Sequence, residues 1–405
     1  MRILYLSQYF PPEMGAPAAR VFELSREWAR LGHDVTVLTG FPHHPTGVVP
    51  EAYRGQFLRR EVVAGIRVIR APLYATANRG RLRRSLSYAS FAAGASLLGG
   101  LLVERPEVLI ASSPQLLTGL AGLWLAGLFR VPLVLEIRDL WPRSIVEVGA
   151  LAAGSPAVRA LERLEGLLYR RADRIVAVSE AFLDHIALHG GARGKLRVVR
   201  NGVDLELFRP RPKLAARRAL GLPESGFLAS YVGTHGMAHG LTTLLEAAQL
   251  APQLQFLCVG EGAEKPRLLE TSARLGLRNV TFWDQRPRED VAQILAASDA
   301  CIVMLKGTPL FRDVIPSKLF EIMGAARPVV LLLEGISRRL VEEAGFGLLV
   351  PPEDAQALAR TLLQAALQPE ALEALGRSGR AYAEAHCSRP ALARAYLDLL
   401  AEVVA

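Results

Sequence analysis

Cysteine and low-complexity sequence are scarce in this chain of 405 residues. Its three cysteines, Cys258, Cys301 and Cys387, stand far apart and show neither a disulfide pattern nor a metal-binding spacing. This scarcity favours a reducing compartment and argues against a zinc site. The N-terminal residues also lack the pattern of a signal peptide, because Met1-Arg2 runs directly into a short strand-like segment.

Lysine is equally scarce. It supplies five of the 48 basic residues, so the net charge of +9 comes almost wholly from arginine. Base composition or a hot environment would explain this bias. A basic balance also suits anionic partners such as a nucleotide, a lipid phosphate or a membrane surface. The chain has no nucleic-acid-binding motif, so nucleic acid is not an expected partner.

Long, strongly apolar runs are lacking, with two borderline exceptions. Residues 85–103 and 111–129 carry no charge, but both are rich in Gly, Ser and Ala. A bilayer-spanning helix needs about 20 strongly apolar residues, so buried helices are the favoured interpretation. The first run follows four arginines, which indicate either contact with an anionic membrane face or a solvated charged surface. These are Arg79, Arg81, Arg83 and Arg84.

Strand and helix patterns alternate along most of the chain, which predicts parallel sheets covered by helices on both faces. A hairpin is expected over 61–73, turning at Ala64-Gly65. A turn and a proline-rich linker over 201–212 interrupt the pattern, which then restarts. The sequence therefore predicts two α/β domains, residues 1–203 and 204–385. A C-terminal helix within residues 386–405 is expected to cross back to the first domain.

Each predicted domain has a glycine-bearing loop between a strand and a helix. The first loop contains Gly15, and the second runs from Gly233 to Gly240. Free backbone N–H groups and the helix dipole favour a phosphate at such a place, where a side chain would block the approach. A dinucleotide oxidoreductase is disfavoured, because the expected glycine pattern and the acidic residue after the second strand are both missing.

Segment 311–323 holds a second group of chemically capable residues. Asp313 precedes a predicted helix, and Glu321 lies within it, in an otherwise apolar stretch. A buried carboxylate needs a partner. One candidate is a ribose diol, and the alternative is an ion pair to Arg312 or Arg327. Lys318 is a flexible point charge suited to a phosphate oxygen.

In these and other segments, the chain resembles the retaining glycosyltransferases of family 4 over nearly its whole length. The supporting strings are PPEMG at 11–15, RLGHDVTV at 30–37 and PSKLFE at 316–321. Three more strings resemble the bacterial surface-polysaccharide branch that includes N-acetyl-fucosaminyl-type transferases: GFPHHP at 40–45, EIRDLWP at 136–142 and GTHGMAHG at 233–240. The resemblance implies the GT-B fold, two Rossmann-like α/β/α domains facing a deep interdomain cleft.

The resemblance also implies a donor site. Glu321 matches the family carboxylate that holds the donor ribose, and Asp313 takes the position of the carboxylate that faces the sugar. The family's cationic pair is absent from the second glycine loop of this chain. The donor diphosphate is therefore expected to contact Gly15, Gly236, His239 and Lys318. The nucleotide is also expected to contact Gly260, Lys265 and Trp283.

On the acceptor side, Arg138-Asp139 occupies the place where the family often has a catalytic histidine. Asp139 is expected to orient or deprotonate the acceptor hydroxyl. Arg138 and His43 are expected to contact the acceptor. The alternatives are a structural Arg–Asp pair and an ordinary loop histidine. Neither glycine loop has an Asp-x-Asp signature, so we expect no metal and no cofactor.

The sequence therefore predicts a cytoplasmic glycosyltransferase that works at the inner face of an anionic membrane. Its expected donor is a UDP-sugar, with an N-acetylated amino or deoxy sugar. Its expected acceptor is a saccharide on polyprenyl diphosphate. A nucleotide-sugar epimerase of the same fold would instead turn over its substrate without any acceptor. A non-catalytic binding protein would bind UDP but release none from any donor.

Overall fold

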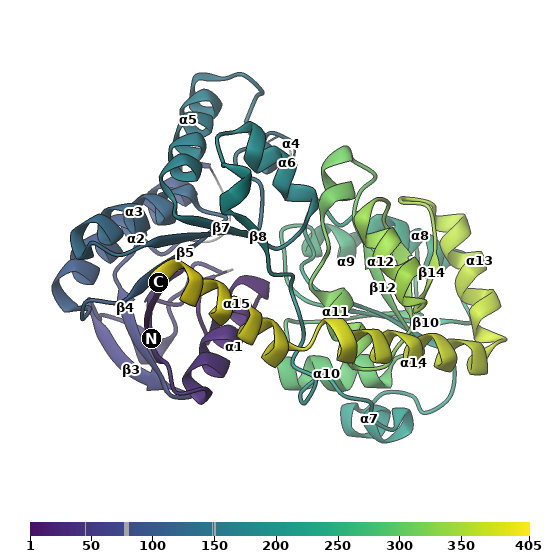
Figure 1. Cartoon of the computed structure of the whole chain (residues 1–405). Helices are drawn as coiled ribbons and strands as arrows, with labels where there is room; N and C mark the ends of the chain where they lie inside the picture. The colour runs from purple at the N-terminus through teal and green to yellow at the C-terminus, as the bar shows by residue number, and fades with distance from the viewer. Residues whose placement is uncertain (45, 77–80, 148, 150) are drawn as a thin grey trace. The chain divides into compact units, whose positions relative to one another are not determined.

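The chain folds into two compact units, which we describe separately. The computed structural model describes residues 1–405 except 45, 77–80, 148 and 150 (Figure 1). Unit 1 comprises Met1–Arg200 and Arg389–Ala405, and unit 2 comprises Asn201–Ser388. Each unit is built around a largely parallel sheet with helices on it. The predicted fold class, two α/β domains, is confirmed.

The sheet of unit 1 has eight strands in the order β3-β4-β2-β1-β5-β6-β7-β8. Only the β3–β4 hairpin is antiparallel, and it turns at Ala64-Gly65, as predicted, with φ angles of 51° and 83°. The strands are β1 (Arg2–Leu6), β2 (Asp34–Gly40), β3 (Arg59–Val63), β4 (Ile66–Ala71), β5 (Val108–Ser112), β6 (Leu133–Ile137), β7 (Arg174–Ala177) and β8 (Leu196–Val198).

Apolar layers cover both faces of this sheet, because alternate residues of a strand point to opposite sides. Leu4 and Leu6 of β1 face one layer, and Ile3 and Tyr5 face the other. The helical segments of unit 1 are α1 (Ala16–Arg30), η1 (Glu51–Tyr53), α2 (Arg81–Leu102), α3 (Leu116–Phe129), α4 (Arg143–Glu147), α5 (Pro156–Arg171), α6 (Ala181–Leu188), η2 (Arg193–Lys195) and α15 (Arg389–Val404).

The last helix, α15, belongs to unit 1, although almost 200 residues separate it from the rest of that unit. The indole Nε1 of Trp28 in α1 donates to the carbonyl of Ala393 at 2.9 Å. Arg389 forms a buried ion pair with Glu23 at 2.6 Å. Val21, Leu24 and Trp28 supply the buried side of α1, and Leu31, which caps the helix, is 44% exposed.

The two apolar runs form α2 and α3, and the expectation that they are buried is only partly right. Leu82–Leu102 is long and apolar enough to cross a membrane. Contrary to the expectation of a buried helix, 28% of its most apolar stretch is buried. One side of α2 packs through Phe91 and Ala95 into the core. Gly100 faces Leu128 and Trp124 of α3, where an added Cβ would lie 2.9 and 3.2 Å away. The outer sides of both helices remain exposed.

Unit 2 has six parallel strands in the order β11-β10-β9-β12-β13-β14. The strands are β9 (Leu228–Val232), β10 (Gln255–Val259), β11 (Val280–Trp283), β12 (Ala300–Met304), β13 (Val329–Leu332) and β14 (Gly347–Leu349). The helical segments are α7 (Lys213–Leu220), α8 (Thr242–Leu250), α9 (Lys265–Arg274), α10 (Arg288–Ala297), η3 (Pro309–Asp313), α11 (Lys318–Gly324), α12 (Ile336–Ala344), α13 (Ala355–Ala366) and α14 (Pro369–His386).

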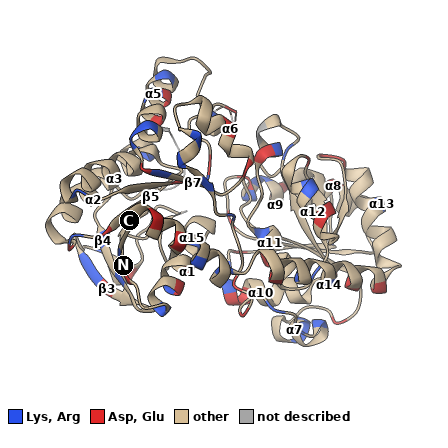
Figure 2. Cartoon of the chain, viewed as in Figure 1, with Lys and Arg blue, Asp and Glu red and all other residues tan. Residues whose placement is uncertain are grey.

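The strand orders mark one place in each unit where a ligand is expected. In unit 1 the chain runs outward from β1 and then resumes at β5 on its other side; in unit 2 it does the same at β9 and β12. Open α/β sheets bind ligands at the carboxyl ends of the strands at such switch points. Most of the ribbon coloured as charged residues belongs to helices and loops of both units, although β3 also carries basic residues (Figure 2).

Candidate active site

Lys318 is the central cation of the candidate site in unit 2. It begins α11, and its Nζ lies 4.1 Å from the centroid of the Tyr231 ring. The ammonium is buried and makes no hydrogen bond within the described part of the chain. Burial lowers the pKa of Lys318 to about 8, although Glu321 acts in the opposite direction. A buried ammonium without a hydrogen-bond acceptor is costly, and an anionic ligand would relieve that cost.

Three glycines allow the loops after β9 and β10 to meet beside this lysine. A Cβ on Gly233 would collide with the Lys318 ammonium, and one on Gly260 would collide with the Gly233 carbonyl. A Cβ on Gly262 would strike the backbone of His235. Gly233 and Gly260 also have φ angles of 150° and 147°, which favour glycine. Gly236, a predicted phosphate contact, meets only ordinary neighbours at 3.4 Å or more.

Two histidines of the second glycine loop lie near Lys318. His235 is wholly buried, and neither of its ring nitrogens makes a hydrogen bond within the described chain. Burial and two lysines lower its pKa to about 4. His239 has an unbonded Nδ1, and burial with Lys318 lowers its pKa to about 3. Buried polar groups are normally paired, so this cluster of unpaired nitrogens indicates a ligand site.

Glu321 lies one turn after Lys318 on α11, and both residues line one small pocket. The expectation that Glu321 is a buried carboxylate is wrong, since its side chain is 25% exposed. Its Oε1 accepts from Nη2 of Arg288 at 3.4 Å, whereas Arg327 donates to the carbonyls of residues 211 and 296. Asp313 lies at the end of η3 and is partly exposed.

The residues predicted to contact the nucleotide lie at the ends of β10 and β11. The Lys265 ammonium already donates to carboxylates of Glu261 and Asp284, at 2.6 and 2.5 Å. The Trp283 carbonyl accepts from the Gly260 N–H at 3.1 Å. These contacts tie the two turns together, and the expected nucleotide contact of Lys265 remains a prediction.

In unit 1, Gly15 stands at the start of α1, with a φ of 154°. No side chain caps this helix, so its first N–H groups are not used by a capping side chain, and such a helix start favours an anionic ligand. Tyr9 stands beside this loop, with its ring 6.3 Å from that of His43, which belongs to the loop after β2. The predicted contact residues Gly15 and His43 therefore belong to neighbouring loops of the same unit.

Glu13, which precedes Gly15, was not singled out in the sequence. Its Oε1 accepts from the backbone N–H groups of His43 and His44, both at 2.9 Å. Its Oε2 is buried and has no hydrogen bond in the described chain. Burial raises the pKa of Glu13 to about 7. A lone carboxylate between two prolines and a methionine was the signal in the sequence that could have found Glu13.

His43, the predicted acceptor contact, is buried. Its side chain belongs to a residue that is 5% exposed, and its Nδ1 lies 3.0 Å from the Phe41 carbonyl oxygen.

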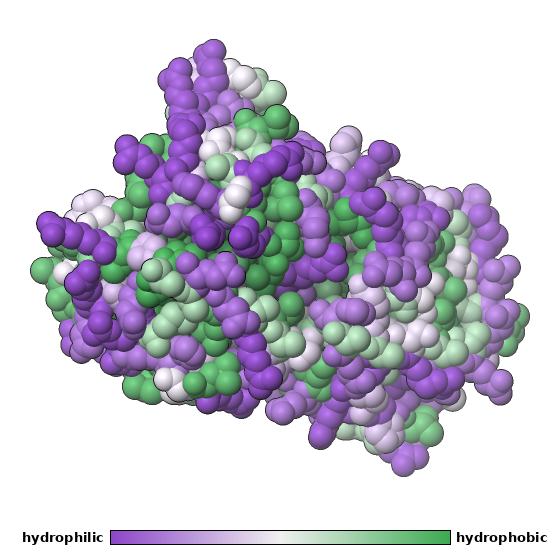
Figure 3. All heavy atoms as spheres, viewed as in Figure 1, coloured by the Kyte–Doolittle hydropathy of each residue, from purple (hydrophilic) through white to green (hydrophobic). Residues whose placement is uncertain are grey.

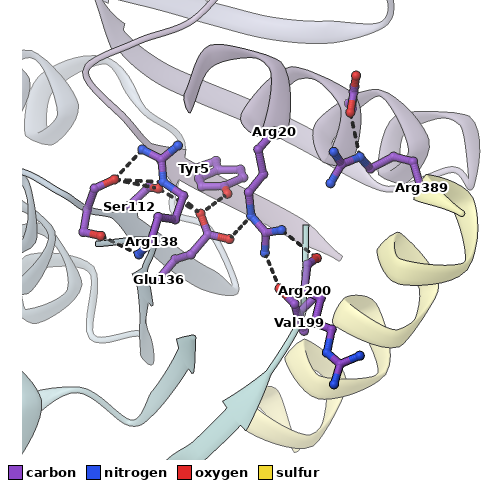
Figure 4. A network of polar contacts seen from close by, with 10 residues as sticks. Tyr5, Arg20, Ser112, Glu136, Arg138, Val199, Arg200 and Arg389 are labelled. Atoms are coloured by element: carbon purple, nitrogen blue, oxygen red, sulfur yellow. Dashed lines mark hydrogen bonds and ion pairs between the residues drawn. The ribbon is translucent and has the colours of Figure 1, made fainter. Parts of the chain in front are cut away.

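A fully hydrogen-bonded network lies at the end of β6 (Figure 4). Buried Glu136 accepts from Tyr5 Oη at 2.7 Å, Ser112 Oγ at 2.8 Å and Arg20 Nε at 2.9 Å. Arg20 also donates to the carbonyls of Val199 and Arg200, both at 3.0 Å. Burial acts to raise the pKa of Glu136, but Arg20 and Arg138 hold it below its usual value. The network is therefore a charged, internally satisfied part of the core.

Arg138 and Asp139 point to different partners. Arg138 Nε donates to the Ser113 carbonyl at 2.9 Å, and its guanidinium lies 3.9 Å from Glu136. Asp139 Oδ2 accepts from Ser144 Oγ at 3.0 Å, and burial raises the pKa of its carboxyl group. Among the described contacts these two side chains form no ion pair with each other. Their acceptor and catalytic roles remain predictions.

The candidate residues thus fall into two groups, one for each unit. Gly15, His43, Arg138 and Asp139 belong to unit 1, and the others belong to unit 2: Gly236, His239, Gly260, Lys265, Trp283, Asp313, Lys318 and Glu321. Each group lies where strands of its sheet end at the carboxyl side. Unit 2 offers a buried cation without a hydrogen bond in the described chain, with a nearby carboxylate, and unit 1 offers a helix N-terminus.

Two protein-family models match the chain in succession. A glycosyl transferase 4-like domain matches residues 15–202, and glycosyl transferases group 1 matches residues 226–367. The chain is 28% identical to the putative colanic acid biosynthesis glycosyl transferase WcaI of Escherichia coli K12, over 91% of this chain and 93% of the relative. It is 31% identical to a D-inositol 3-phosphate glycosyltransferase of Saccharomonospora viridis, over 71% of this chain and 69% of the relative.

Solved structures of low sequence identity share the fold. Sucrose-phosphate synthase from Thermosynechococcus elongatus superimposes with a TM-score of 0.80 at 23% identity, covering 99% of this chain and 98% of that one. HepE of Anabaena, solved in complex with UDP-glucose, gives a TM-score of 0.74 at 19% identity, covering 99% of both chains. The fold of this chain is therefore GT-B.

Proposed function

This chain belongs to the glycosyltransferases, and we propose that it moves a sugar, with retention, from a UDP-sugar to a saccharide on polyprenyl diphosphate. The observation that carries the donor side is a cluster of buried side-chain nitrogens without a hydrogen bond in the described chain: Nζ of Lys318, both ring nitrogens of His235 and Nδ1 of His239. A diphosphate would supply the missing acceptors and the negative charge. The complex of HepE with UDP-glucose supports UDP as the nucleotide.

In the proposed reaction, negative charge grows on the diphosphate as it leaves the anomeric carbon. Lys318 and the N-terminus of α1 at Gly15 would stabilise that charge. Glu321 would accept hydrogen bonds from the ribose, with Arg288 holding its other side, and Asp313 would face the sugar. Asp139, with Ser144 as its partner, would orient the acceptor hydroxyl. No divalent metal is required in this scheme, because protein groups neutralise the leaving diphosphate.

The proposed acceptor is lipid-linked, and the surface of unit 1 supports this choice. Leu97, Leu101, Trp124 and Leu128, which we call the α2–α3 apolar ridge, are 51–71% exposed. Apolar atoms reach the surface over this part of unit 1 (Figure 3).

Arginines lie beside this ridge. Arg130 caps the end of α3, and Arg105 donates to the carbonyl of residue 129. Exposed apolar side chains beside arginines suit an anionic membrane face. Arg79 lies outside the described residues, as does the side chain of Arg81.

Relatives guide the biological setting of the proposal. WcaI of Escherichia coli bears a name that places it in colanic acid biosynthesis. We propose a corresponding role in cell-surface polysaccharide synthesis at the cytoplasmic face of the membrane. An N-acetylated amino or deoxy sugar is the proposed cargo, on the strength of the sequence resemblance alone.

The decisive experiment is a screen of nucleotide sugars for protection against heat unfolding, since a ligand raises apparent stability by mass action. The best donor is then incubated with a polyprenyl-diphosphate-linked saccharide, with and without a chelator. We expect UDP release that depends on the acceptor, persists with chelator, and yields a product of the donor's anomeric configuration. Turnover without acceptor would instead identify an epimerase, and UDP binding without release from any pair would identify a binding protein.

A further inference from the structure

Glu165, His185 and His189 form a cluster in unit 1 that the proposed reaction does not use. Glu165 lies on α5, His185 lies on α6, and His189 caps the end of α6. Each offers one ligand atom, and the three atoms lie within 4.8 Å of one another. The two histidines are four positions apart, which places their side chains one above the other on a single helix face.

Glu165 is the buried member of the cluster. Its side chain is wholly buried, and its Oε1 accepts from Tyr169 Oη at 2.9 Å and lies 3.0 Å from His185 Nε2. Its Oε2 is buried and makes no hydrogen bond within the described part of the chain. A buried carboxylate with an unoccupied oxygen is expected to have a cation near it.

The proton positions on His189 suit a metal ligand. Its Nδ1 lies 2.8 Å from the carbonyl oxygen of His185. Because a carbonyl can only accept, Nδ1 carries a proton, and in the neutral ring Nε2 then keeps its lone pair. Metal-bound histidines usually donate their other nitrogen to a backbone carbonyl or carboxylate in this way. The hydroxyl of Tyr169 would likewise fix the orientation of the carboxylate.

The stacking of the two imidazoles points in the same direction. Their ring centroids are 4.0 Å apart, and the ring planes differ by 22°. This stacking places the two imidazoles close enough for one ion to contact a nitrogen of each. His189 is partly exposed, so its ring has room to move the roughly 1 Å or more needed to bring the ligands to tetrahedral spacing around zinc.

We propose that Glu165, His185 and His189 bind one divalent transition metal, with Zn²⁺ as the best match, and that the ion links α5 to α6. Imidazole nitrogens with one carboxylate suit zinc, and three protein ligands leave a fourth position for water. The scattered cysteines argued against a zinc site, but that argument covers only sites built from cysteine. The proposed ion is structural and takes no part in sugar transfer, so this proposal does not rest on the proposed function.

The test uses the full chain after removal of metal with a chelator. Cobalt(II) is added first, because tetrahedral cobalt absorbs strongly in the visible range, and zinc is then added to displace it. We expect one metal per chain, loss of the cobalt spectrum with zinc, and a higher melting temperature with zinc. At a free zinc concentration of about 100 times Kd, the ratio of folded to unfolded protein rises about 100-fold.

His189→Ala and His185→Ala should weaken zinc binding at least 10-fold and remove the zinc-dependent rise in melting temperature. The matched control is His386→Ala, which removes an exposed histidine of α14 in unit 2 and should leave both unchanged. Because these variants could lose stability on their own, circular dichroism and UDP binding by unit 2 confirm that each is folded. Glu165→Gln, which keeps the shape but not the charge, should also lose affinity.

A chain that binds neither cobalt nor zinc would overturn the proposal. Equal zinc affinity in the wild type and in the folded His185 and His189 variants would do the same. Sugar transfer by the metal-free protein at low temperature should equal that of the zinc-loaded protein, so failure of the metal site and failure of the proposed function give different results.

Discussion

The network around Glu136 of β6 in unit 1 and the loop after β9 in unit 2 both lie near the carboxyl ends of parallel strands, yet their hydrogen bonding differs. In unit 1 the buried carboxylate of Glu136 is satisfied by the protein, because it receives three hydrogen bonds, one of them from Arg20. In unit 2, Lys318 and His235 are buried without hydrogen bonds in the described chain. A polar network whose hydrogen bonds are all made within the protein supports a rigid core. Buried nitrogens without hydrogen bonds indicate a place where a ligand binds.

The largest expected effect comes from breaking the satisfied network. Arg20→Met should destabilise unit 1 by about 3–5 kcal/mol, because it leaves Glu136 as a buried, unpaired charge. Urea unfolding followed by tryptophan fluorescence measures this, since Trp28, Trp124 and Trp141 belong to unit 1. Arg30→Met on the same helix is the control: the Arg30 side chain is 57% exposed, so less than about 1 kcal/mol is expected. If both substitutions lowered the free energy of unfolding equally, the hydrogen bonds of Arg20 to the Glu136 network would not stabilise unit 1.

Glu13 of unit 1 differs from Glu136, because its Oε2 is buried without a hydrogen bond in the described chain, and the pH dependence of stability tests this difference. Its pKa is raised by burial from 4.5 to about 7 in the folded chain, so the neutral form is favoured there. This group therefore stabilises the fold below about pH 4.5, and that contribution is lost as pH rises to about 7, a change of roughly 3 kcal/mol at most.

Glu13→Gln keeps a hydrogen-bond acceptor but cannot ionise. The difference in unfolding free energy between wild type and this variant should shift in favour of the variant from pH 4.5 to pH 7, and then level off. Melting temperatures across this range measure it. If the difference in unfolding free energy between wild type and Glu13→Gln did not change with pH, burial would not raise the pKa of Glu13.

Removal of the unsatisfied cation tests unit 2. Lys318→Ala should weaken UDP binding by about 10- to 150-fold, the value of a hydrogen bond to a charged group. The affinity of the wild type for UDP should also fall as pH rises through about 8, where burial places the pKa of Lys318. Lys318→Arg should make the affinity for UDP less dependent on pH, because arginine stays charged.

Isothermal titration calorimetry measures both effects. Lys213→Ala is the matched control, because Lys213 is a cation of unit 2 that pairs with Asp299 and lies outside the candidate site. If the two alanine variants bound UDP equally well, Lys318 would not be the phosphate contact.

The smallest expected effect concerns the α2–α3 apolar ridge. Trp124→Asp and Leu128→Asp should each reduce binding to vesicles that contain phosphatidylglycerol by about 10-fold, the value of one large apolar side chain. Vesicle flotation measures the bound fraction. Leu367→Asp is the control, because that leucine is 83% exposed but belongs to unit 2. Equal losses from all three would contradict a membrane face specific to unit 1.

Much of the fold followed from local pattern. The alternation of strands and helices predicted two α/β domains, and the hairpin at Ala64-Gly65 was placed correctly, because turn chemistry acts over neighbouring residues. The glycosyltransferase family and the GT-B fold were predicted and are confirmed. The N-acetyl-fucosaminyl specificity, the retention of configuration and the roles of individual site residues stay predictions.

The errors concern burial and partners. Glu321 was expected in the core because its chain neighbours are apolar, yet it is 25% exposed and its partner Arg288 lies 33 positions away. The apolar run of α2 was expected to be buried, but only one side of the helix meets the core. Side-chain exposure depends on what packs against an element, and local sequence does not specify that.

By itself, the sequence determined the elements and the glycine loops, because these depend on periodicity and on backbone freedom within a few residues. It also made Lys318 conspicuous through the scarcity of lysine. Only the tertiary structure decided which polar groups are satisfied, since hydrogen bonds such as those of Glu136 join residues more than 100 positions apart. The approach of Glu165 to His185, 20 positions later, also depends on packing, because α5 and α6 are successive helices that local sequence does not place side by side.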